Sequence, residues 1–431
     1  MPTIVVFCHL RWNFVYQRPQ QLLSRLAQHY RILFIEEPVH TGGDGFMRQS
    51  SPTTNVTVCT PHTPSHAIGF HDDQIPLLQP LLATLLEPGE RPIVWFYTPM
   101  ALPLLPELQP SLVVYDCMDE LTAFKSPPKQ LLQRETALLN LADLVFAGGP
   151  SLYEAKRERH ANAHCFPSSV DVRHFERALE REASHRLQQD IPHPRLGFYG
   201  VIDERFDCVL IAAIAAAHPD WQVVLVGPVV KIDPAHLPRR PNIHYLGQQG
   251  YDDLPAFLAG WDVCLLPFAL NQATRFISPT KVLEYMAAEL PIVSTPIADV
   301  ERPHGHVVAI ARAPAAFVAA CEAALAQDAA AREVMLATMR AIVAGTSWEV
   351  TANAMRGLIE RAPRRSGAPC FASSDSAAAA AGAVAGATAR VNPLRGQGAV
   401  QKVQAAVTGN VAPGQSLSYP RDEGTVFLEI N

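Results

Sequence analysis

The 431-residue sequence has no run of 18 apolar residues, so we expect no membrane-spanning helix. It opens without a basic, then apolar, then small-residue leader, so no secretory signal is expected. None of its eight cysteines forms a C-x-x-C pair, which argues against a zinc ribbon or disulfide framework and favours the reducing cytosol. Charged residues make up only 18%, and the net charge of −6 argues against a nucleic-acid partner.

Several catalytic motifs are also absent. The sequence contains no P-loop, no G-x-G-x-x-G after its first apolar run, no G-x-S-x-G and no H-E-x-x-H. These absences argue against kinase, dinucleotide oxidoreductase, hydrolase and metalloprotease functions. No D-x-D motif or cluster of metal ligands is visible either, and no cofactor is expected.

Short apolar runs alternate with helix-length amphipathic stretches over the first 350 residues. This alternation predicts an α/β fold with parallel sheets and right-handed crossovers. The runs are almost continuously apolar, as expected for strands that are covered on both faces. We expect strands at 3–8, 31–35, 92–97, 111–115, 143–147, 196–200, 222–226, 243–246, 262–266 and 291–294.

The series divides near residues 165–195, which predicts two doubly wound, Rossmann-like domains facing across a cleft. We expect an N-terminal domain at 1–170 and a C-terminal domain at 171–345, with chemistry at the carboxyl ends of the strands. A helix at 346–363, opened by a Thr346-x-x-Glu349 capping box, could cross back to the first domain. Ala-, Gly- and Ser-rich composition predicts a flexible tail at 364–431, with one short strand at 425–430.

The most informative segment is S-P-T-K-V-L-E-Y-M-A-A, residues 278–288. Ser278 suits an N-cap and Pro279 the first helical position, so free N–H groups at the helix start could bind a diphosphate. Lys281 in the first turn could add positive charge. Glu284, four residues beyond Thr280, falls on the same face one turn deeper and could accept hydrogen bonds from both hydroxyls of a ribose. An ordinary capped helix with a surface Glu and Lys is the alternative, and spacing alone leaves both open.

Other candidates follow strands of the predicted first domain. His9 and Arg11 come just after the first strand, and Trp12 could stack on a sugar or pack the wall of the domain. Asp116 and Asp119 follow the fourth strand, where a carboxylate could bond an acceptor hydroxyl, stabilise a cationic transition state or only cap a turn.

Two sets of basic residues also stand out. Arg18 in the first domain, and Arg205 soon after Gly200 in the second, could meet an anionic donor or acceptor, because planar Arg suits phosphate. Lys156, Arg157 and Arg159, near Arg134, form a small basic run. It could attract anionic lipid headgroups or be a solvated helix face.

Residues 278–288 resemble the donor-site motif of retaining GT-B glycosyltransferases that use nucleotide sugars. The sequence departs from that motif in two places: Phe276 stands eight before Glu284, where the family often has a second Glu, and Glu289 replaces a Gly. H-L-R-W at 9–12 with Q-R-P-Q at 17–20, Y-D-C-M-D-E at 115–120, P-S-S-V-D at 167–171 and G-F-Y-G at 197–200 resemble segments of a bacterial branch of this family. The resemblance covers roughly residues 3–362.

The resemblance implies a cytoplasmic, metal-independent hexosyltransferase of cell-surface polysaccharide synthesis that retains anomeric configuration. Expected partners are a nucleoside diphosphate sugar, a glycan or lipid-linked acceptor, and peripherally the inner membrane face. A sugar-nucleotide epimerase and a non-catalytic sugar-nucleotide-binding protein remain alternatives. Expected catalytic residues are Asp119, Asp116 and His9; expected donor-binding residues are Glu284, Lys281, Thr280, Pro279, Ser278, Arg205 and Gly200; expected acceptor or cleft residues are Arg11, Trp12 and Arg18.

Overall fold

The computed structural model describes residues 1–125 and 127–366, which we call the described chain. The predicted tail, with its expected strand at 425–430, lies outside the described residues from position 367 onward. The tail prediction began too early, because Arg365 is held in place: its Nε lies 2.8 Å from Oδ2 of Asp143 and its N–H donates to the carbonyl of Ser111 at 3.0 Å.

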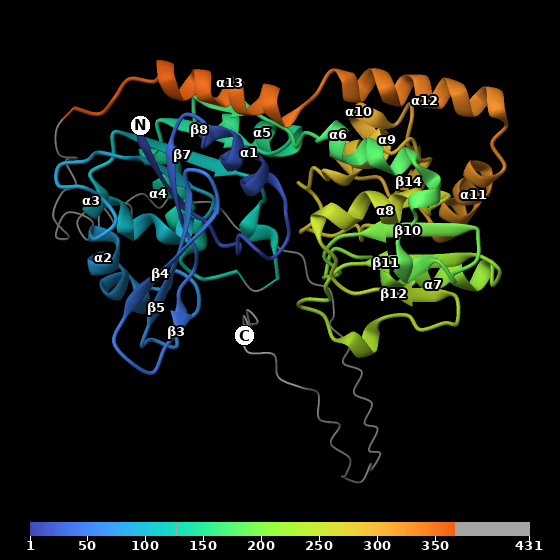
Figure 1. The fold of residues 1–431 in the computed structure, drawn as a ribbon, viewed down its shortest axis with the longest axis horizontal. Helices are drawn as coiled ribbons and strands as arrows, with labels where there is room; N and C mark the ends of the chain where they lie inside the picture. The colour runs from blue at the N-terminus through green and yellow to red at the C-terminus, as the bar shows by residue number, and fades with distance from the viewer. Residues whose placement is uncertain (126, 367–431) are drawn as a thin grey trace, which may run out of the picture. The chain divides into compact units, whose positions relative to one another are not determined.

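The α/β fold is confirmed, with two separate sheets (Figure 1). The first sheet has the order β3-β5-β2-β1-β6-β7-β8-β9, and β4 pairs with β5. Its strands are β1 (Thr3–Phe7), β2 (Arg31–Ile35), β3 (Val39–His40), β4 (Phe46–Thr53), β5 (Val56–Thr63), β6 (Ile93–Phe96), β7 (Leu112–Cys117), β8 (Leu144–Ala147) and β9 (Ala163–Cys165). With it go helices α1 (Arg18–Leu26), α2 (Ile75–Ala83), α3 (Leu105–Leu108), α4 (Leu131–Leu141) and α5 (Pro150–Arg157). We call this the N-terminal half.

The second sheet is parallel throughout and has the order β12-β11-β10-β13-β14-β15. Its strands are β10 (Arg195–Tyr199), β11 (Gln222–Val226), β12 (Ile243–Tyr245), β13 (Val263–Leu266), β14 (Ile292–Ser294) and β15 (Ala309–Ile310). Its helices are α6 (Val172–Phe175), α7 (Cys208–Ala217), α8 (Leu254–Ala259), α9 (Lys281–Ala287), α10 (Ala298–His304), α11 (Pro314–Leu325) and α12 (Ala329–Ala344). We call this the C-terminal half. The predicted domain limits at 170 and 345 stay predictions.

Both strand orders reverse direction next to a central strand. The chain leaves β1 for β2 on one side and returns to β6 on the other, and it leaves β10 for β11 and returns to β13. Loops that diverge at such a point leave a crevice beyond the carboxyl ends of the strands. The segments after β1, β10 and β13 are therefore the ones positioned to bind a ligand.

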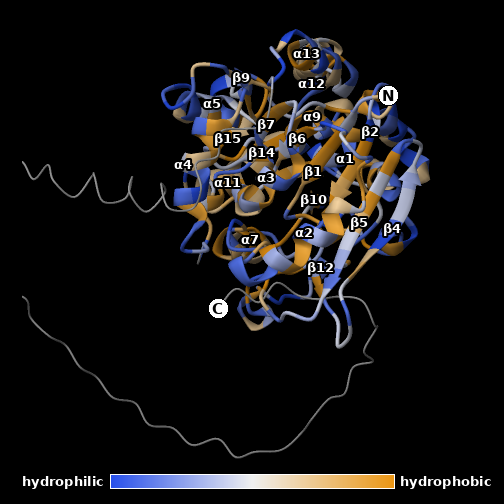
Figure 2. Cartoon of the chain, turned by 90° about the vertical axis from the view of Figure 1, so that its left-hand side faces the viewer, coloured by the Kyte–Doolittle hydropathy of each residue, from blue (hydrophilic) through white to orange (hydrophobic). Residues whose placement is uncertain are grey.

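Apolar strands form the centre of each half (Figure 2). On β10 and β11, Phe198 and Leu225 join the apolar cluster on one face of the sheet, whereas Tyr199 and Val224 join the cluster on the other. The final helix, α13 (Trp348–Arg361), packs against α1, and its buried Trp348 shares a cluster with the N-terminal half. No helix of the described chain is long and apolar enough to cross a membrane.

All ten predicted strands are present, but five further strands of the described chain were missed. One of the two longest of these, β4, carries mostly exposed polar side chains, because it pairs only with β5 at the edge of the sheet. Its residues show no apolar run, so periodicity could not find it.

The predicted cap of the last helix was also one residue early: Ser347, not Thr346, accepts the hydrogen bond from the N–H of Val350.

The fold explains one glycine of the G-F-Y-G segment. An ideal Cβ on Gly197 would lie 1.9 Å from Cδ2 of Trp261, whose ring is buried against β10. We predict that Gly197→Ala lowers Tm by about 5 °C, because overpacking a core costs roughly 1–3 kcal/mol. Differential scanning calorimetry tests this. Gly43→Ala, at a site with no neighbour within 4 Å, is the control; equal Tm values for the two variants would contradict the packing argument.

Candidate active site

A cavity opens at the carboxyl ends of the strands and is lined from both halves of the molecule. The N-terminal half contributes the segment before α1 and the residues that follow β7. The C-terminal half contributes the loop after β10 and the start of α9. Among the predicted site residues, the cavity brings together Arg18, Asp119, Gly200, Arg205, Ser278, Pro279, Thr280, Lys281 and Glu284. We call this the donor-side cavity.

The helix behind the strongest motif starts later than predicted. Thr280, in helical conformation, precedes the first residue of α9, Lys281, and no side chain caps this end. Ser278 and Pro279 are therefore not the N-cap and first helical residue; they form the half-buried approach to the helix. The helix is fixed by its apolar side, because Tyr285 and Met286 are fully buried in the core of the C-terminal half.

Glu284 lies buried at the base of the cavity and is 9% exposed. The hydroxyl of Tyr199, at the end of β10, donates a hydrogen bond to its Oε2 at 2.5 Å. Burial raises the pKa of Glu284, while the Tyr199 hydrogen bond and the charge of Lys281 act in the opposite direction. The second carboxylate oxygen accepts no hydrogen bond from the described chain and remains available to a ligand.

Two cations accompany this carboxylate. Burial lowers the pKa of Lys281, against the attraction of Glu284, and its Nζ lies 5.7 Å from the centre of the Phe198 ring. Gly200 makes room for it: with φ of +139°, a Cβ there would lie 2.4 Å from Cε of Lys281. Arg205 is oriented by Asp203, whose carboxylate lies 2.6 Å from the guanidinium. The cavity thus presents positive charge beside a buried acid.

The two predicted aspartates of the N-terminal half differ in their surroundings. Asp116 is fully buried and binds Arg18, with its Oδ1 2.9 Å from the guanidinium. It does not line the cavity. Asp119 does, and its side chain accepts no hydrogen bond from the described residues. Burial raises its pKa, although Arg205 opposes this. Asp116 therefore holds Arg18 in place, while Asp119 is free to meet a ligand.

The H-L-R-W segment lies beside the cavity without lining it. Trp12 packs against Phe34 within the N-terminal core, with ring centres 5.1 Å apart, which agrees with the packing alternative rather than with stacking on a sugar. Arg11 binds Glu36 at 3.0 Å. Burial, aided by Lys231, lowers the pKa of His9 to about 4, so its imidazole is neutral at pH 7.

Two solved structures have a similar fold. Sucrose-phosphate synthase from Thermosynechococcus elongatus superposes with a TM-score of 0.64 at 17% identity, over 84% of this chain and 99% of that one. HepE of Anabaena, in complex with UDP and glucose, gives 0.61 at 14% identity, over 84% and 100%. At these identities the likeness establishes the GT-B fold.

Sequence comparison adds the activity. A family model described as glycosyl transferases group 1 matches residues 193–327, which include the loop after β10 and all of α9. A Bacillus subtilis (strain 168) protein named as the teichuronic acid biosynthesis glycosyltransferase TuaH is 26% identical over 277 residues, 58% of this chain and 68% of the relative. The chain is a GT-B glycosyltransferase.

Sequence reasoning missed three residues near the active site of this glycosyltransferase. Tyr199 orients Glu284, and Tyr251 joins the halves by stacking on Tyr16 at 4.5 Å. Glu37 follows β2, and an ideal Cβ on Gly69 would lie 2.9 Å from its Oε1. Position at a strand end could have identified Tyr199 and Glu37, but nothing in the sequence marks Tyr251.

The basic run at the end of α5 is divided between the core and the surface. Lys156 is 1% exposed and its Nζ lies 2.7 Å from both Glu120 and Glu135. Arg159 binds the other oxygen of Glu135 at 3.0 Å. Lys156 thus belongs to a buried ion-pair network, whereas Arg157 and Arg159 are exposed at the end of the helix. The described chain holds no group of three or more His, Cys, Asp or Glu arranged to bind a metal ion.

Glu37 makes stability depend on pH. Burial raises its pKa from 4.5 to about 7, against the attraction of Arg11 and Lys231. Between these pH values the folded glycosyltransferase holds a proton that the unfolded chain has lost, so stability falls as pH rises, by about 3 kcal/mol in total. We predict that Glu37→Gln removes this loss: its Tm should match the wild type near pH 4.5 and exceed it by several degrees at pH 8.

Thermal unfolding across this pH range tests the prediction. The control is Glu158→Gln, at an exposed carboxylate at the end of α5, which should follow the wild type at every pH. A constant Tm difference between Glu37→Gln and the wild type would contradict the raised pKa.

Proposed function

We propose that the glycosyltransferase moves a hexosyl group from a nucleoside diphosphate sugar to a hydroxyl of a glycan or lipid-linked acceptor during cell-surface polysaccharide synthesis. The observation that carries this proposal is the buried Glu284, bonded by Tyr199 and placed one helical turn beyond Lys281 in a cavity lined from both halves. The name of the Bacillus relative supports the choice of a surface polysaccharide. Because lipid-linked acceptors are membrane-bound, peripheral contact with the membrane is part of the proposal.

The donor would lie along the start of α9. Glu284 would accept hydrogen bonds from the two ribose hydroxyls, since a carboxylate offers several lone pairs to such donors. Lys281, Arg205 and the segment from Ser278 to Thr280 would surround the diphosphate. In this partly buried setting, each cation stabilises the phosphate charge more strongly than it would in water. These contacts would hold both the ribose and the diphosphate of the nucleotide.

The reaction would proceed with retention at the anomeric carbon. The bond between the anomeric carbon and the phosphate oxygen breaks, and the diphosphate takes the bonding electrons. Arg205 and Lys281 stabilise that growing charge, which is the largest electrostatic demand of the step. The acceptor oxygen bonds to the anomeric carbon on the same face, and its proton passes to the departing phosphate. Asp119 would steady the oxocarbenium-like centre or the incoming hydroxyl.

We predict that Glu284→Ala loses most of the thermal stabilisation that a nucleoside diphosphate sugar gives the wild type. The loss should reach at least tenfold in Kd, because charged hydrogen bonds contribute about 1.5–3 kcal/mol each. Scanning fluorimetry with UDP-, GDP-, ADP- and dTDP-sugars measures it. Glu289→Gln, two residues past the end of the helix and outside the cavity, should behave as the wild type.

The same donors, with acceptor added, test the reaction itself: nucleoside diphosphate should appear only when an acceptor hydroxyl is present. An equal thermal shift in the Glu284→Ala variant and the wild type would remove the ribose assignment. Donor binding with no release across a broad acceptor panel would instead favour a binding protein.

We also propose that transfer requires no metal ion, since Lys281 and Arg205 are placed to neutralise the diphosphate. Activity should therefore be unchanged, within about twofold, after treatment with excess EDTA. Arg205→Met should lower kcat by about a hundredfold at a temperature at which the variant remains folded, since loss of one charge-stabilising donor typically has that effect. Activity that vanishes in EDTA and returns with Mg²⁺ or Mn²⁺ would overturn metal independence.

A further inference from the structure

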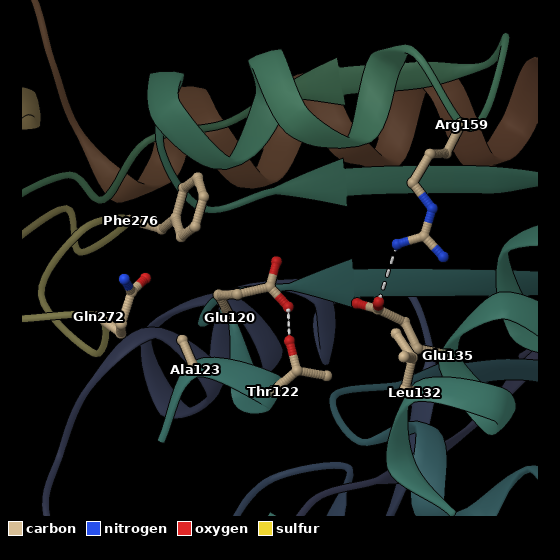
Figure 3. Close-up of a pocket in the computed structure, with 8 residues that line it drawn as sticks. All are labelled: Glu120, Thr122, Ala123, Leu132, Glu135, Arg159, Gln272 and Phe276. Carbon is tan, nitrogen blue, oxygen red and sulfur yellow. Dashed lines mark hydrogen bonds and ion pairs between the residues drawn. The ribbon is translucent and has the colours of Figure 1, made fainter. Parts of the chain in front are cut away.

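A second cavity, of about 480 Å³, lies where the two halves meet and takes no part in the donor contacts above (Figure 3). The N-terminal half supplies Glu120 and Thr122, together with Glu135 on α4. The C-terminal half supplies Gln272 and Phe276 from the loop between β13 and α9. Figure 3 shows the Glu120 carboxylate between the ring of Phe276 and the hydroxyl of Thr122.

This second cavity adjoins the donor-side cavity along two chain segments. After β7, Asp119 lines the donor-side cavity and the next residue, Glu120, lines the second one. Before α9, Ile277 lines the donor-side cavity and the preceding residue, Phe276, lines the second one. On both walls, neighbouring residues in the chain therefore line the two cavities, so a ligand that fills one cavity lies next to the lining of the other.

The order of the proposed contacts along α9 gives the direction in which the nucleotide sugar would lie. This step rests on the proposed function. Glu284 would hold the ribose, and Lys281 to Ser278 the diphosphate. The chain then runs on, away from the ribose, to Ile277 and Phe276. The group beyond the diphosphate in a nucleotide sugar is the sugar itself. The second cavity thus lies at the sugar end of the donor, where the acceptor must also arrive.

Glu120 is fixed in place but keeps unused hydrogen-bonding capacity. Its side chain is 13% exposed; Oε2 lies 2.7 Å from Nζ of the buried Lys156, and Oε1 accepts from the Thr122 hydroxyl at 2.6 Å. A carboxylate has about four lone-pair sites, so about two remain for a ligand. Glu135, by contrast, already accepts hydrogen bonds from Tyr115, Lys156 and Arg159.

The rest of the lining fits an uncharged, hydroxyl-rich ring. Phe276 and Leu132 offer apolar surface against which the C–H face of a sugar can pack, and Gln272 offers both a donor and an acceptor. The negative charges of Glu120 and Glu135 are balanced by Lys156 and Arg159. A few placed polar groups on an apolar wall are typical of small-molecule sites.

We propose that this second cavity binds a sugar ring and that the Glu120 carboxylate, positioned by Lys156, accepts its hydroxyls. The ring belongs either to the donor or to the acceptor. Glu120 is then a specificity-determining residue of the glycosyltransferase, and Lys156 is a positioning residue.

Calorimetric titration of the full-length protein with UDP and UDP-glucose, and with the GDP–mannose and ADP–glucose pairs, separates the two sources. If the ring is the donor's, Glu120→Gln lowers the ratio of nucleotide Kd to nucleotide-sugar Kd about tenfold, since one charged hydrogen bond is lost. The Kd of the bare nucleotide stays unchanged. If the ring is the acceptor's, those ratios hold, and the variant instead weakens binding of methyl α-glucoside to the nucleotide-loaded protein by a similar factor.

Glu158→Gln is the matched control, because it makes the same substitution at an exposed carboxylate outside both cavities. Phe276→Ala should reproduce the direction of the Glu120→Gln effect through the lost apolar wall. The proposal is overturned if neither measurement changes in Glu120→Gln, or if bare nucleotide binding weakens as much as nucleotide-sugar binding. A wild type that binds no nucleotide contradicts the proposed donor site, and methyl glucoside binding to the free protein then tests the second cavity alone.

Discussion

The arrangement of the site depends on charged groups that are kept out of water where the two halves meet. Glu284 and Lys281 lie one helical turn apart, and burial opposes the charged form of each. The isolated ions would be expensive in such a setting, so each persists through its partners: Tyr199 donates to the carboxylate, and the two charges attract one another. The same low polarity that makes these ions costly strengthens their attraction for a phosphate or a hydroxyl.

That environment exists only while the halves stay together, and several contacts hold them. The Ser151 hydroxyl and N–H, at the start of α5, both bind Asp299 at the start of α10. The hydroxyl of Tyr251 accepts a hydrogen bond from Gln21 at 2.9 Å. Phe124 lies between two cations of the other half, 5.3 Å from Arg205 and 5.6 Å from Lys231. Arg205 also lines the donor-side cavity, so this contact joins the halves beside the proposed donor site.

The sequence predicted most of the fold because its central strands are covered on both faces and therefore read as apolar runs. Edge strand β4 was not predicted because most of its exposed residues are polar. Within the candidate site, positions along the chain were predictable but side-chain environments were not. Periodicity placed Glu284 one turn beyond Thr280, yet it could not show that Trp12 points into the core or that Lys156 is buried between two carboxylates. Both depend on partners distant in sequence, for example Phe34 for Trp12 and Glu120 for Lys156.

Hydrogen-bond saturation separates carboxylates that hold the structure from those available to substrates. Both carboxylate oxygens of Asp116 accept hydrogen bonds from Arg18. The Glu36 carboxylate accepts hydrogen bonds from Arg11, Trp12 and Thr60. The Glu135 carboxylate accepts them from Lys156 and Arg159. Glu284 has a single protein donor, while Asp119 has none among the described side chains. A buried acceptor without a donor costs free energy, and a ligand that donates to Glu284 or Asp119 would remove that cost. Both acids line the donor-side cavity, and Glu120, which keeps unused acceptor sites, lines the second cavity. The proposal that a nucleotide, its sugar and an incoming hydroxyl bind side by side rests on these acids and on the two chain segments that the cavities share.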